Sequence, residues 1–187
     1  MNLRRRDILY YLMPLLLFVA ALVQATLLLR VQVANVKPHL VLILVIVGTL
    51  IYGGKNGIVW AFVGGLALDL FSGGPMGSSS LALIAAAVVA SPGHRTLSRF
   101  NVIVPLAAIA LGTMAYGATY IAVLTLVEVI VVLPFFSGLG LTPVHYGLGF
   151  LPTLQYVVLP AMAYNTLVVL ALTPALNLVP ESHDVGV

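Results

Sequence analysis

Long apolar runs make up most of this sequence, and short segments rich in glycine, proline or basic residues separate them. Only 7% of the 187 residues are charged, whereas soluble domains carry roughly a quarter, so a soluble globule is excluded. A helix that crosses the hydrocarbon core of a bilayer needs about 20 mostly apolar residues. The sequence therefore predicts an all-α, polytopic membrane protein with about six transmembrane helices in one integral membrane domain. We expect the helices over residues 8–29, 38–52, 57–71, 78–91, 102–133 and 153–178.

Basic residues are unevenly distributed among the connecting segments. With a cytoplasmic N-terminus and six spans, the inner segments hold six of them and the outer segments two, in agreement with the excess of Lys and Arg in cytoplasmic loops. The first apolar run is longer than the core of a signal peptide, so we expect a retained helix. Five spans, with the C-terminus outside, remain the alternative. The inner residues are Arg4, Arg5, Arg6, Lys55, Arg95 and Arg99, and the outer ones are Arg30 and Lys37.

The apolar run from Val102 to Leu133 is too long for one span and too short for two. As a helix it would extend roughly 48 Å, so we expect one tilted helix that projects past the outer interface. Residues 134–152 are rich in Gly and Pro and predict an outer loop. We expect the last helix to be kinked near Pro160, since proline lacks a backbone donor.

Small residues recur at helical spacing in two of the shorter runs. Residues at every fourth position share one face of a helix, and small side chains let membrane helices approach closely. We therefore predict that the third and fourth helices pack together, and that their small faces, with one aspartate, form a helix-packing or partner interface. The candidate residues are Gly57, Ala61, Gly65, Asp69, Gly73, Gly77, Ala82, Ala86 and Ala90.

Asp69 is the candidate for a functional residue, because a carboxylate inside a membrane usually has a partner or a role. Its position on the small-residue face predicts that it points at protein. One interpretation is a structural carboxylate that holds the turn from Ser72 to Gly77 through backbone amides. An interaction or regulatory role, and proton or ion handling, are the alternatives. Glu128 is expected to be an interfacial acid near the outer headgroups.

Enzyme motifs are absent from the sequence. It contains no cysteine, no nucleophile elbow, no zinc-protease motif and no phosphate-binding loop. Asp69, Glu128 and His145 could form an acid–base cluster at the outer face, but we predict no catalytic, cofactor-binding or metal-binding residue and no enzyme activity. Two intramembrane amides, Gln24 and Asn165, are expected to join helices. The remaining histidines, His39, His94 and His183, lack ligand spacing and are expected to be solvated or interfacial.

The stretch from Pro38 to Gly77 resembles the MreD family of rod-shape-determining membrane proteins. The resemblance rests on Pro38-His39-Leu40, the glycine turn at 53–57 and the pattern Gly-Leu-x-x-Asp-Leu…Gly-x-Pro-x-Gly over residues 65–77. His39 departs from the small polar or acidic residue expected after the proline. Weaker similarity in size and segment spacing extends over residues 8–178.

This resemblance implies a non-enzymatic component of the machinery that elongates rod-shaped bacterial cells, located in the cytoplasmic membrane. The family is thought to bind MreC and, through it, MreB and the peptidoglycan synthase formed by RodA and its transpeptidase. No cofactor is implied. The family fold is similar to that of the substrate-binding components of energy-coupling-factor vitamin transporters, which also have six helices.

Two functions therefore remain open for the sequence. As a scaffold, the protein would present small-residue faces to partner transmembrane segments and help regulate peptidoglycan synthesis. As a transporter component, it would dock an energy-coupling subunit through Ala21-x-x-x-Ala25 and hold a vitamin at its outer face. The polar residues available to line such a site are Gln32, Asn35, Asp69 and His145, and the single tryptophan, Trp60, is expected near the inner side.

Overall fold

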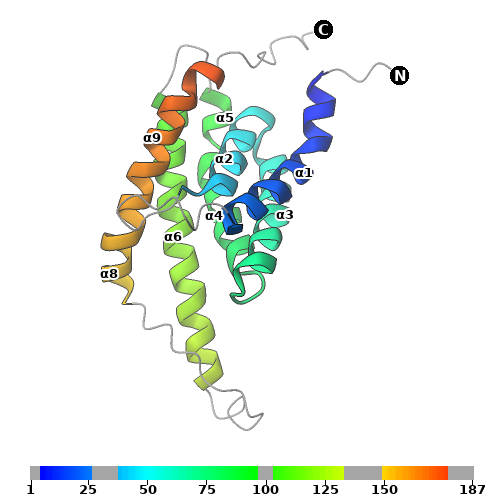
Figure 1. The fold of residues 1–187 in the computed structure, drawn as a ribbon. Helices are drawn as coiled ribbons and strands as arrows, with labels where there is room; N and C mark the ends of the chain where they lie inside the picture. Colours follow the sequence, from blue (N-terminus) through cyan, green and yellow to red (C-terminus); the bar gives the residue numbers. More distant parts are fainter. Residues whose placement is uncertain (1–4, 27–37, 97–102, 133–148, 177–187) are drawn as a thin grey trace.

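The structure is a computed structural model that describes residues 5–26, 38–96, 103–132 and 149–176. In this part of the chain every regular element is a helix, so the predicted all-α fold is confirmed (Figure 1). The last three helical elements follow one another directly and form one rod. The elements are α1 (Arg5–Thr26), α2 (Leu40–Tyr52), α3 (Gly54–Ser72), α4 (Ser78–Ala90), α5 (Gly93–Thr96), α6 (Ile103–Val132), α8 (Phe150–Thr153), the π-helical turn η1 (Leu154–Val158) and α9 (Leu159–Leu176).

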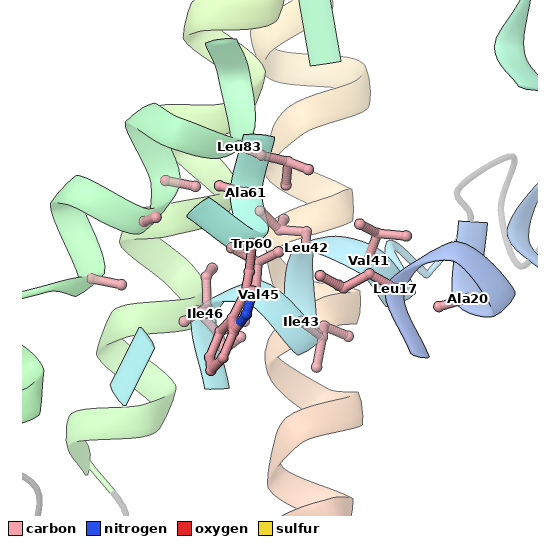
Figure 2. Packing of buried hydrophobic residues seen from close by; sticks show 14 of the residues in the cluster. Leu17, Ala20, Val41, Leu42, Ile43, Val45, Ile46, Trp60, Ala61 and Leu83 are labelled. Atoms are coloured by element: carbon pink, nitrogen blue, oxygen red, sulfur yellow. The ribbon is translucent and has the colours of Figure 1, made fainter. Parts of the chain in front are cut away.

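Helix α2 lies at the centre of the bundle and packs against α1, α3, α4 and α6. Its side chains Val41, Leu42, Val45 and Ile46 are fully buried. These residues belong to one hydrophobic cluster, and Figure 2 shows them together with Trp60 of α3. Because α2 is apolar on nearly every face, it can be stable only when other helices surround it.

The helices differ widely in length. Helices α2 and α4 have 13 residues each, which at 1.5 Å per residue is about 20 Å and less than the roughly 30 Å of a hydrocarbon core. Helix α3 has 19 residues and α6 has 30, so α6 extends about 45 Å. Figure 1 shows its C-terminal part extending beyond the end of α3 and α4. The prediction of one long helix over residues 102–133 is therefore confirmed.

The turn between α2 and α3 is tighter than predicted. Helix α3 begins at Gly54 and not at Gly57, so Lys55 lies within its first turn. Gly53 alone forms the turn, with a φ of +88° that favours glycine. The connection between α4 and α6 contains the short helix α5, which sequence reasoning did not predict.

The last helix begins earlier than predicted and is irregular. It starts at Phe150, so Pro152, placed in the outer loop by the sequence, lies in its first turn, where proline is tolerated. The irregularity is the π-helical turn η1, just before Pro160, where the Leu159 amide donates to the carbonyl of Leu154. Because Pro160 has no N–H for the preceding turn, this wider turn accommodates it. The rest of the predicted loop, residues 134–148, lies outside the described residues.

Candidate functional site

The carboxylate of Asp69 lies at the N-terminus of α4, although Asp69 belongs to α3. Its Oδ2 accepts a hydrogen bond of 2.7 Å from the amide of Gly77, and its Oδ1 accepts one of 3.0 Å from the amide of Ser79. The side chain is 2% exposed. The first amides of a helix have no partner within the helix and carry partial positive charge. Asp69 therefore caps a neighbouring helix, and the predictions that it faces protein and holds the turn through amides are confirmed.

The turn between α3 and α4 places these amides against the carboxylate. Gly73 and Gly77 have φ values of +67° and +92°, which side-chain-bearing residues rarely adopt. The hydroxyl of Ser78 donates to the carbonyl of Pro75 at 2.7 Å and lies 3.4 Å from Oδ1 of Asp69. The local sequence thus reverses the chain and aims the start of α4 at Asp69.

Helices α3 and α4 are in backbone contact at Gly65. A Cβ atom built on Gly65 would overlap the backbone of Ser80. The Ser80 hydroxyl donates to the carbonyl of Phe62 at 3.2 Å, which adds a polar bond at the same place. Gly57 belongs to the same predicted face but packs on Thr49 of α2. The small residues of α3 therefore serve two neighbouring helices and not α4 alone.

The nine predicted interface residues fall into two groups. A Cβ atom added to Gly73 or Gly77 would meet no other atom within 4 Å, so the turn conformation, and not packing, explains these glycines. The other seven are buried against their own chain. Their use as an interface with a partner stays a prediction. The seven are Gly57, Ala61, Gly65, Asp69, Ala82, Ala86 and Ala90.

A second polar cluster holds the first turn of α2. Asn165 of α9 accepts from the amide of His39 at 3.0 Å through Oδ1. Gln24 of α1 accepts from the amide of Val41 at 3.3 Å. The amide of Leu42 donates to Nδ1 of His39 at 3.2 Å, so this ring nitrogen carries no proton and the imidazole is neutral. The prediction that Gln24 and Asn165 join helices is confirmed.

Helix α6 contributes two polar residues that connect these clusters. Thr113 accepts from Nδ2 of Asn165 at 3.3 Å. The Tyr116 ring lies edge-on to His39 with 4.6 Å between centroids, and its hydroxyl hydrogen-bonds Ser79 beside the Asp69 carboxylate. Sequence reasoning did not single out Tyr116, because one aromatic residue in an apolar run has no distinctive spacing. The only available signal was the presence of polar residues at the N-terminal ends of α2 and α4, which Tyr116 contacts.

Two histidines that were predicted to be solvated or interfacial are half-buried and bonded at the ends of α2. His39 is part of the polar cluster at the start of α2. His94 donates from Nδ1 to the carbonyl of Leu50 at 2.7 Å, since a carbonyl can only accept. It thereby satisfies one of the last carbonyls of α2, which lack partners within the helix. His145, His183, Gln32 and Asn35 lie outside the described residues.

Among the described residues, the polar side chains support the fold and are not grouped as a metal site. No group of three His, Asp or Glu side chains placed to hold a metal ion occurs among them. Each buried side-chain nitrogen or oxygen in this part of the chain has a hydrogen-bond partner. Glu128 is half-buried near the C-terminal end of α6. The polar side chains described above thus hold helix ends in place.

The fold and these intramembrane polar contacts define an all-α membrane protein. Two stretches, Ile103–Ile130 and Phe150–Ala171, are long and apolar enough to cross a membrane. The chain belongs to the MreD family, since the family model described as rod shape-determining protein MreD matches residues 5–179. Membership implies a role in rod shape determination. Comparison with curated proteins and with solved structures gave no match, so the expected likeness to vitamin-transporter components stays a prediction.

Proposed function

We propose that this protein is a non-enzymatic scaffold in the bacterial cytoplasmic membrane that binds MreC and helps regulate peptidoglycan synthesis during cell elongation. MreB, RodA and its transpeptidase partner would be reached through MreC or within the same complex. The membership of residues 5–179 in the MreD family supports this proposal.

The hydrogen bonding of the Asp69 carboxylate is the structural observation that carries the proposal. The stretch from Gly65 to Gly77 carries part of the resemblance to the family, and its only acid has both carboxylate oxygens engaged by backbone amides. A carboxylate used in this way stabilises the joint between α3 and α4. A scaffold needs such fixed joints, because its partners bind a shape and not a reacting group.

The charge distribution supports a cytoplasmic N-terminus with several spans. Lys55 lies in the first turn of α3 and Asp69 lies near its last turn, at opposite ends of the helix. Arg95 lies at the same end as Lys55, since Gly54 packs against Ser91 and His94 bonds the end of α2. Cations gathered at one end favour that end as the cytoplasmic one.

The vitamin-binding alternative has less support from the described residues. Asp69, one of its four proposed lining residues, is engaged in capping α4. Trp60 is 2% exposed and packs edge-on against Tyr52 with 5.2 Å between ring centroids. An aromatic residue that clamps a planar ligand must present a free face, and Trp60 is buried in the core instead.

Co-purification from mild detergent tests the scaffold proposal. Tagged protein expressed with the MreC of the same bacterium should retain MreC through washing, whereas a tagged unrelated polytopic membrane protein should not. Recovery of an energy-coupling module without MreC would contradict the proposal. So would folded, monodisperse protein that retains no MreC.

A further inference from the structure

The first turn of α2 is bonded to helices on both sides of it. Gln24 of α1 accepts from the amide of Val41, and Asn165 of α9 accepts from the amide of His39. In Figure 1, α1 and α9 lie on opposite sides of α2. Helix α1 packs mainly on α3 and α2, and α9 packs mainly on α6. Two peripheral helices thus hold adjacent parts of one turn.

These bonds are costly to break. Asn165 and the Val41 side chain are both fully buried. An unpaired amide in an apolar interior loses its hydrogen bond without gaining one to water. If α1 or α9 shifted alone, a backbone donor at the start of α2 would be left without its acceptor. The free energy is therefore lower when α2 moves together with the shifted helix than when that helix moves alone.

The first turn of α2 is held together by its own hydrogen bonds and can therefore move as one rigid unit. Leu42 donates to Nδ1 of His39, and Ile43 donates to its carbonyl, so residues 39–43 are closed into one hydrogen-bonded turn. The His39 ring meets Tyr116 of α6, and Asn165 also donates to Thr113 of that helix. A shift at one acceptor is therefore not absorbed by local flexing of the turn.

We propose that Gln24 and Asn165 form a brace that couples the position of α1 to that of α9 through residues 39–43. A partner that displaces either helix then displaces the other. The coupling is reciprocal, because a coupling free energy acts equally in both directions. This inference concerns the internal mechanics of the bundle and does not depend on which partner binds.

Distances between spin labels test the coupling, and the absence of native cysteine makes the labels specific. Labels on Leu22 of α1 and Leu70 of α3, both exposed, report the position of α1. The parent protein should give a single narrow Leu22–Leu70 distance peak. Asn165→Leu, a change on α9, should give a broad or shifted distribution instead. Thr166→Val is the matched control, since the Thr166 hydroxyl bonds only its own helix at Met162, and it should leave the peak unchanged.

The reciprocal variant keeps the test decisive if Asn165→Leu does not fold. Gln24→Leu, on α1, should broaden the distance between labels on Leu167 of α9 and Leu111 of α6, which are both exposed. An unchanged Leu22–Leu70 peak in folded Asn165→Leu would overturn the proposal. An unchanged Leu167–Leu111 peak in folded Gln24→Leu would overturn it equally.

Discussion

At the scale of the residue, polar side chains inside this protein act on the backbone of other helices. Asp69 caps α4, while Gln24 and Asn165 hold α2. The spacing of small residues predicted correctly that Asp69 faces protein. The particular amides could not be predicted, because they depend on two left-handed glycines whose turn geometry becomes clear only in three dimensions.

Replacing Asp69 by leucine should destabilise the fold strongly. The change leaves the amides of Gly77 and Ser79 without an acceptor, and hydrogen bonds to a charged group contribute roughly 1.5–3 kcal/mol each. We expect a loss of about 3 kcal/mol or more in the free energy of unfolding, measured in mild detergent. Met76→Leu, at an exposed position of the same turn, should have no effect. A variant Asp69→Leu as stable as the parent protein would exclude the capping role.

At the scale of the element, the short helices depend on side chains from their neighbours, α2 at both ends and α4 at its N-terminus. The sequence predicted one continuous long helix from the apolar run at 102–133, and α6 is that helix. It did not predict η1, because the effect of Pro160 depends on how the preceding turn can widen. It placed the start of α3 too late, because a lysine between glycines and an asparagine is typical of a turn.

Gly65→Ala should loosen the contact between α3 and α4. The added methyl group meets the backbone of Ser80, which cannot rotate away as a side chain would. Overpacking of this kind costs about 1–3 kcal/mol, and thermal unfolding should report it. Gly74→Ala is the control, because its Cβ would lie 3.5 Å or more from other atoms. Equal melting temperatures for the two variants would show that the close approach carries no stability.

At the scale of the whole molecule, composition and apolar runs were enough to predict an all-α membrane bundle, and the motifs between Pro38 and Gly77 were enough to indicate the family. The arrangement of the helices was not predictable, because apolar runs carry little information on which neighbour each face contacts. Gly57 and Gly65 show the limit: they share one predicted face but pack on different helices. Tyr116 shows it again, since its importance comes from elements distant in sequence.

The orientation proposed from the charge distribution can be measured in intact cells. Cysteines replacing Lys55 and Met76, both exposed, lie at opposite ends of the α3–α4 pair. With the N-terminus in the cytoplasm, an impermeant maleimide should label the Met76 position and not the Lys55 position. Labelling at Lys55 alone would reverse the proposed topology. Permeabilised cells, in which both positions should react, provide the control.

In the proposed scaffold, Asp69 stabilises the connection between α3 and α4 and is not itself a contact or reacting group. The most direct measurement is the amount of MreC retained by Asp69→Asn per mole of folded protein. Asparagine keeps one oxygen acceptor for the α4 amides but has no charge. We expect the same retention as for the parent protein, with lower thermal stability. Folded Asp69→Asn that no longer retains MreC, while the parent protein does, would contradict this expectation.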